Sequence, residues 1–179
     1  MATVGGGNFS VEIGDSMMLG QAPLSGTCDG ASELSWPISE RTGPTLSVIV
    51  PEGIEWVATP TFSTEEFASD FDLKSDCGQF SDVYSALMNA DTGYTHYNAF
   101  DAAEWTSRVD RAAAELDTLA TAAQSPLGDA LTQVYTVVSD PGRTVGSVLT
   151  ADAQAPIGEI SEACNANQTP LILKAEFGG

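Results

Sequence analysis

The chain has very few basic residues. It contains 25 Asp and Glu but only 6 Lys and Arg, for a net charge of -19, and Arg41 is the one basic residue before Lys74. Such a charge repels the phosphate backbone of nucleic acids and anionic lipid headgroups. The composition therefore argues against nucleic-acid binding, and it favours cations, basic protein partners or simple solubility outside a cell.

Long apolar runs are also missing. The longest apolar stretches, such as residues 46–50, have the length of a strand and fall far short of the roughly 18 residues of a membrane span. We therefore expect no direct membrane insertion. Residues 1–8 are rich in glycine and lack the basic and apolar regions of a signal peptide. We interpret them as a flexible tether, and we expect a secreted or lipid-anchored protein whose leader and anchor lie upstream.

Cysteine is scarce as well. The three cysteines form no Cys-x-x-Cys motif and no Cys/His cluster, which argues against a structural zinc site, and no motif predicts a cofactor. Cys28 and Cys77 both lie in turn-like contexts, so we predict that they form a disulfide worth about 3–4 kcal/mol. Cys164 lies in a helical pattern and is predicted to be a buried thiol. The alternative is three reduced cysteines without a role.

The first third of the chain has the alternation of β-strands. Residues 9–13 alternate between apolar and polar side chains. Residues 45–50 and 54–59 also alternate, and the turn signal Pro51-Glu-Gly53 separates them, so we predict a hairpin. Residues 20–44 are rich in Gly, Pro, Ser and Thr and are predicted to form mostly loop.

The later part of the chain has helical periodicity. Apolar side chains recur at intervals of three or four within residues 80–88, 101–123, 126–138 and 156–167. The helix over residues 101–123 opens on Asp101-Ala-Ala-Glu104, which resembles a capping box. Its apolar stripe begins at Trp105, and we predict that the stripe packs on the sheet with Trp105 buried.

Residues 171–177 alternate again and predict a final strand that returns to the N-terminal sheet. The pattern as a whole predicts an α+β fold. We expect a small antiparallel sheet, built from the N-terminal strands and the C-terminal strand, that is covered on one face by three to four helices. After the tether of residues 1–8, residues 9–179 are predicted to form a single globular domain.

One short segment resembles a catalytic motif. Residues 11–20, Val-Glu-Ile-Gly-Asp-Ser-Met-Met-Leu-Gly, resemble the first block of the GDSL or SGNH hydrolases. That resemblance implies an esterase in which Ser16 is the nucleophile. The family's Gly-x-Asn-Asp block and its Asp-x-x-His block are missing here, and no histidine follows His96. Because a nucleophilic serine needs a base that takes its proton, an ordinary turn after a strand is the competing interpretation.

Two other residue groups are candidate ligand sites. His96, the one histidine, stands with Tyr94 and Tyr97 in a loop-like segment, where it could orient a ligand or change its charge near neutral pH. The acidic segment with Asp70, Asp72 and Asp76 suggests a calcium site. Its spacing does not fit an EF-hand, and a solvated acidic loop is the alternative.

The style of the chain resembles that of secreted actinobacterial lipoproteins, which are acidic, poor in lysine and rich in Ala, Thr and Asp. Residues 46–53 and 163–171 carry this resemblance, together with the Phe-Gly-Gly end. It implies a location in the cell envelope. We therefore expect a non-enzymatic extracytoplasmic binding or assembly module that engages a protein partner there. The alternatives are the Ser16 esterase and a structural subunit of a virion or surface appendage.

Overall fold

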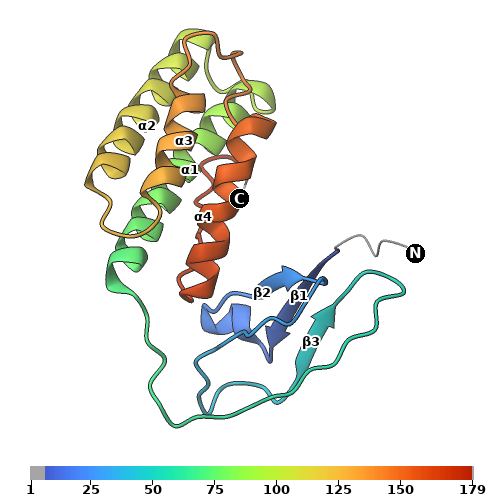
Figure 1. The fold of residues 1–179 in the computed structure, drawn as a ribbon. Coiled ribbons are helices and arrows are strands. Elements are labelled where there is room, and N and C mark those ends of the chain that lie inside the picture. Colours follow the sequence, from blue (N-terminus) through green and yellow to red (C-terminus); the bar gives the residue numbers. More distant parts are fainter. Residues whose placement is uncertain (1–6, 179) are drawn as a thin grey trace.

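The computed structural model describes residues 7–178 and contains three strands and four long helices (Figure 1). The elements in chain order are β1 (Asn8–Ile13), a short 3-10 helix η1 (Ser16–Leu19), β2 (Leu24–Thr27), β3 (Leu46–Ile49), α1 (Phe71–Thr95), α2 (Ala102–Ala122), α3 (Gly128–Val138) and α4 (Ala151–Ala166). The predicted α+β class is confirmed.

The predicted tether of residues 1–8 falls mostly outside the described residues, because the description begins at residue 7. Asn8 belongs to the sheet, and Gly7 is bonded beside it. The amide of Cys28 donates to the carbonyl of Gly7 at 2.7 Å, and β1 begins at Asn8.

The sheet is antiparallel with the strand order β2-β1-β3. The central strand β1 pairs its Val11 with Leu24 of β2 and with Val48 of β3. Gly14 ends β1 with a φ of +53°, and a Cβ atom at this position would lie 2.6 Å from the backbone nitrogen of Gly43. Only glycine fits here, because the backbone is left-handed and the backbone of Gly43 leaves no room for a side chain.

The hairpin predicted over residues 45–50 and 54–59 is half correct. β3 occupies the first half, but residues 54–59 form no strand, and the whole segment 51–70 contains neither helix nor strand. A strand gains stability when one of its faces is buried. Neither face of the second half meets the core, since the adjacent side chains of Trp56 and Val57 are 51% and 92% exposed.

The four helices pack against one another in chain order, α1 on α2, α2 on α3 and α3 on α4 (Figure 1). The sheet lies at one end of this bundle and contacts it through β2 and α4. The largest fully buried side chains belong to the four helices or, for Val148, to the loop before α4: Trp105, Phe80, Leu87, Leu116, Leu131, Ile160, Val109, Val134, Val138, Val148, Cys77 and Cys164.

The apolar stripe of α2 is buried as predicted, with Trp105 only 1% exposed, but its partner is different. The stripe packs on α1 and α3 rather than on the sheet. The reason is length. A helix of 21 residues is about 32 Å long, whereas strands of four to six residues reach only about 13–20 Å. Only other helices can cover the whole stripe.

Two helices begin earlier than the periodicity predicts. α1 starts nine residues before residue 80, and α4 starts five residues before Pro156, which lies inside the helix. The carboxylate of Asp70 caps α1 by accepting a hydrogen bond from the Leu73 amide at 3.0 Å. The first turns of α4 hold only Ala, Asp and Gln, and in those of α1 the only large apolar residues are Phe71 and Leu73, two positions apart, so no helical period marks either start.

The predicted C-terminal strand is wrong. Residues 171–177, here called the C-terminal strap, form no strand and do not return to the sheet. The strap instead runs along α1. Three polar side chains of α1 bond to its backbone: Ser81 to Ile172, Ser85 and Asn89 to Lys174, and Asn89 also to Glu176. These side chains take the place of a neighbouring strand, so the alternation correctly indicates an extended chain but not its partner.

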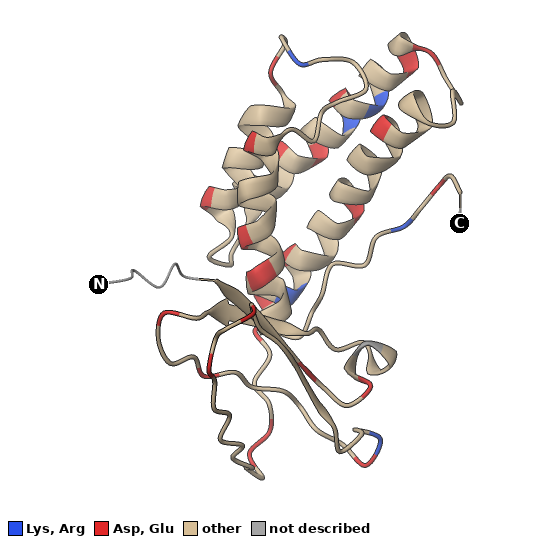
Figure 2. Ribbon diagram, turned by 90° about the vertical axis from the view of Figure 1, so that its right-hand side faces the viewer, with Lys and Arg blue, Asp and Glu red and all other residues tan. Residues whose placement is uncertain are grey.

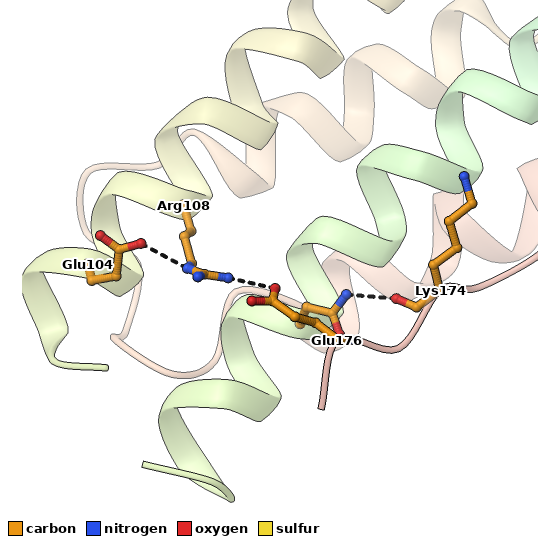
Figure 3. A network of polar contacts seen from close by, with 5 residues as sticks. Glu104, Arg108, Lys174 and Glu176 are labelled. Atoms are coloured by element: carbon orange, nitrogen blue, oxygen red, sulfur yellow. Dashed lines mark hydrogen bonds and ion pairs between the residues drawn. The ribbon is translucent and has the colours of Figure 1, made fainter. Parts of the chain in front are cut away.

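Charged contacts hold the outer part of the strap. Arg108 of α2 lies between Glu104, at 2.9 Å, and Glu176 of the strap, at 2.7 Å (Figure 3). The hydrogen bond to Glu176 raises the pKa of the Arg108 guanidinium, although partial burial works against it. The guanidinium also lies 4.5 Å from the centre of the Phe100 ring. The end of the strap is thus tied to both α1 and α2.

Gly93 of α1 makes room for the strap, which leads to a prediction. A Cβ atom at this position would lie 2.6 Å from the Phe100 ring and 2.7 Å from the Phe177 ring. We expect Gly93→Ala to lower the free energy of unfolding by about 1–3 kcal/mol and to raise amide hydrogen exchange in the strap. The control is Gly78→Ala in the same helix, where nothing lies within 4 Å. It should stabilise by up to about 1 kcal/mol. Equal effects of the two changes would contradict this account of the strap.

The predicted Cys28–Cys77 disulfide is also wrong. Cys77 of α1 is bonded to Cys164 of α4, and Cys28 is a free, half-buried thiol beside β2. Both bonded residues lie on the buried faces of their helices and are at most 1% exposed. The pairing follows from which helix faces meet in the bundle, and turn propensity near a cysteine does not report this.

Candidate interaction surfaces

The structure places Ser16 in a buried turn. Ser16 begins η1, has no exposed surface, and donates a hydrogen bond from its Oγ to Glu12 Oε1 at 3.0 Å. The carbonyl of Ser16 also accepts the Gln21 amide at 2.9 Å. These bonds fix the turn between β1 and β2.

The structure does not bring His96 to Ser16. Asp70, at the start of α1, contacts Asn167 beyond α4, and Gln168 accepts the Ala22 amide from the segment after η1. The segment that follows η1 therefore lies near the start of α1, whereas His96 follows its end. α1 has 25 residues and is about 37 Å long, so His96 is at the opposite end of this helix from the segment after Ser16. His96 is exposed, and its Nδ1 lies 2.8 Å from the Thr95 hydroxyl.

Tyr94 and Tyr97, the other predicted ligand residues, contact the chain itself. The Tyr97 ring stacks on Phe177 of the strap with 5.7 Å between ring centres. Tyr94 packs against the core, and a Cβ atom at Gly146 would lie 2.8 Å from its ring. The two tyrosines therefore hold the strap and the loop before α4, while His96 remains beside them on the surface.

The carboxylates of the predicted calcium segment have separate structural contacts. Asp70 caps α1, Asp72 stands in the first turn of the helix, and Asp76 is buried and accepts the Ser125 amide at 3.2 Å. Over residues 7–178, no three His, Cys, Asp or Glu side chains are grouped so that they could hold a metal ion. The segment is the start of a helix and not the loop that a calcium site needs.

The acidic charge is largely uncompensated. Ion pairs engage three of the six cations, Arg108, Arg143 and Lys174, and only four of the 25 carboxylates within the described chain. Figure 2 shows acidic positions along the helices and loops, with basic positions at only a few places. The surface thus keeps an unbalanced negative field.

One part of the bundle has no cation of its own. α3 and α4 contain no Lys or Arg, yet α4 exposes Asp152, Glu159 and Glu162. Asp152 and Glu159 are seven residues apart and so point to the same side of the helix. We call this surface the α4 acidic face. Small exposed residues such as Ala155 lie between the carboxylates and leave them open to approach.

An open groove of about 480 Å³ borders the α4 acidic face. It lies between β2, residues 33–35 and the last turns of α4, and both Glu33 and Glu162 line it. The carbonyl end of α4 adds the negative end of the helix dipole to the same place. A groove with two carboxylates and a helix C-terminus favours a cationic group.

Comparison with known proteins gives no relative for this chain. No protein family, no curated protein and no solved structure matches it significantly. A search of the helices over residues 7–178 finds none whose length and apolar character would let it cross a bilayer. The surfaces described above are therefore the features that bear on function.

Sequence reasoning missed both the groove and an exposed apolar segment. Glu33 and Glu162 are 129 positions apart in the sequence, so no local motif joins them. The apolar side chains of Trp56, Val57 and Phe62 were expected in or near a strand, but they are 51%, 92% and 79% exposed. Large apolar side chains are usually buried, and only the structure shows that these three lie outside the core.

Proposed function

We propose that this chain is a non-enzymatic binding module of the cell envelope, and that it engages a basic surface of a protein partner. The observation that carries the proposal is the uncompensated charge, with only four of 25 carboxylates in ion pairs over residues 7–178. A field of this sign attracts and orients a basic partner before contact.

The α4 acidic face is the proposed contact surface. A lysine or arginine of the partner meets no competing cation on α3 or α4. The groove between Glu33 and Glu162 has the volume to take such a side chain. Its guanidinium or ammonium group would bond to the carboxylates, and its stem would lie on Leu24 and Leu34.

An extracytoplasmic location is part of the proposal. The Cys77–Cys164 disulfide supports it, because structural disulfides persist in oxidising compartments and are rare in the cytosol. The low lysine content and the resemblance of residues 46–53 and 163–171 to envelope lipoproteins point in the same direction.

The binding surface can be tested by charge removal with a matched control. A photo-reactive amino acid at Ala155, which is exposed on α4, would capture the partner in the envelope fraction of the native host. With the captured partner purified, we expect Glu159→Gln with Glu162→Gln to weaken binding about tenfold. The control, Glu115→Gln with Asp117→Asn, removes two exposed charges from α2 and should change the affinity less than twofold.

Salt supplies a second measurement on the same complex. Affinity should fall as ionic strength rises from about 0.05 to about 0.2 M, and the parent should lose more than the α4 variant. Equal weakening by the α2 and α4 changes, or an affinity that rises with salt, would overturn the proposed surface.

A further inference from the structure

β3 presents an unpaired strand edge. It is an outer strand of the sheet and pairs only with β1. The Gly14 amide bonds to the Thr45 carbonyl at 2.7 Å, so the backbone groups of Thr45 point toward β1. Because these groups alternate along an antiparallel strand, those of Leu46 and Val48 point away from the sheet. No backbone hydrogen bond within residues 7–178 uses this outer edge.

The edge is accompanied by exposed apolar side chains. Leu46 and Ile49 of β3 are 47% and 73% exposed, on opposite faces of the strand. Trp56, Val57 and Phe62 follow within the next thirteen residues and are also exposed. The strand and the segment that follows it thus expose five large apolar side chains.

This segment lacks the charge that the rest of the chain has in excess. Residues 42–51 and 56–64 contain no Asp, Glu, Lys or Arg, although the net charge of the chain is -19. Natural edge strands commonly carry charges that prevent edge-to-edge pairing. β3 carries no such charge, although it is only four residues long and lies between Pro44 and Pro51.

We propose that β3 pairs edge to edge with β3 of a second copy of this chain. The two strands run antiparallel about a twofold axis, so Leu46 and Val48 of each copy exchange backbone hydrogen bonds with the other. The two three-stranded sheets join into one, and the side chains of Leu46 and Ile49 gain cross-strand neighbours from the other copy.

A second copy fits this edge better than a partner of another kind. An antiparallel strand edge is its own complement under a twofold axis, so one uncharged segment supplies both halves of the interface. A basic partner has no reason to choose it, since residues 42–51 contain no carboxylate. This inference does not rest on the function proposed for the α4 acidic face.

The charge of the whole chain gives the dimer an unusual salt dependence. Two copies at -19 each repel one another at long range, and added salt screens the repulsion without weakening the uncharged contact. Dimerisation should therefore strengthen with salt, whereas binding of a basic partner weakens.

Sedimentation velocity over a range of protein concentrations tests the proposal. At about 1 M NaCl we expect a reversible dimer, with an affinity at least several-fold above that at about 0.1 M. Ile49→Lys should weaken the dimer tenfold or more, because it places a cation beside the edge in both copies. The control is Ile172→Lys in the C-terminal strap, where the side chain is 68% exposed and distant from β3 in sequence. It should leave the dimer unchanged.

Hydrogen exchange identifies the edge directly and also shows that the variants fold. The amides of Leu46 and Val48 should become protected as the dimer forms, and α2 should be equally protected in parent and variants. A parent that stays monomeric at about 1 M NaCl overturns the proposal. A dimer that survives Ile49→Lys, that Ile172→Lys weakens equally, or that leaves the two amides unprotected overturns it as well.

Discussion

Replacing Trp105 with alanine should lower the free energy of unfolding by about 3–5 kcal/mol, the largest effect we expect from one substitution. The ring is 1% exposed, and its Nε1 donates to Asp91 of α1 at 2.9 Å. The same carboxylate accepts the Val148 amide at 2.9 Å and the Leu149 amide at 3.3 Å. Trp105 and Asp91 thus join α1, α2 and the loop before α4.

Urea denaturation of the purified protein measures this effect. Trp105→Phe keeps most of the ring but loses the bond to Asp91, and it should cost less than the alanine change. Trp56→Ala provides the control, since this tryptophan is half exposed and outside the core. If Trp105→Ala keeps the parental unfolding midpoint but no longer binds the partner, the binding surface is the apolar stripe of α2 and not the α4 acidic face.

Removing the disulfide should have the second large effect. Cys77 and Cys164 are 87 positions apart, and closing a loop of this length stabilises by about 4–5 kcal/mol in the chain-entropy model. Domains have about 5–15 kcal/mol of stability in total. We therefore expect the double change Cys77→Ala with Cys164→Ala to unfold at a much lower urea concentration than the parent. Cys28→Ser removes the free thiol and should leave the midpoint almost unchanged.

Alkylation of the non-reduced protein followed by mass spectrometry checks the pairing itself. Only Cys28 should be labelled, and a Cys77–Cys164 peptide pair should appear after digestion without reductant. Labelling of Cys77 and Cys164 in the folded protein would refute the assigned bond. If the double variant instead keeps the parental urea midpoint, the unfolded chain between residues 77 and 164 is already restricted without the disulfide.

Several elements follow from the sequence because the signals for them are local. Asp101 caps α2 by accepting the Glu104 amide at 2.9 Å, as the capping-box pattern predicts. The apolar period that begins at Trp105 is long enough to specify a helix with one buried face. β1 and β3 follow from alternation over residues 9–13 and 45–50 in the same way. Each of these signals depends on residues within a few positions of one another.

The candidate surfaces were less accessible to sequence reasoning. The excess of carboxylates could be counted, but which of them are exposed on a surface without a cation, as on α4, only the structure shows. Ser16 and Tyr97 matched the residue types of functional sites, and the structure gives both of them contacts within the chain. Residue type indicates what a side chain could do, but burial and neighbours decide what it can reach.

What the sequence by itself determined is thus the charge, most of the helices, two strands and the extended form of residues 171–177. The tertiary structure alone decided the partners of these elements. Cys77 meets Cys164 because α1 and α4 turn these faces toward each other. The C-terminal strap lies on α1 because Ser81, Ser85 and Asn89 supply the hydrogen bonds that a strand would have supplied. Periodicity specifies local conformation and which face is apolar, whereas pairing depends on the length and shape of surfaces that are distant in the sequence.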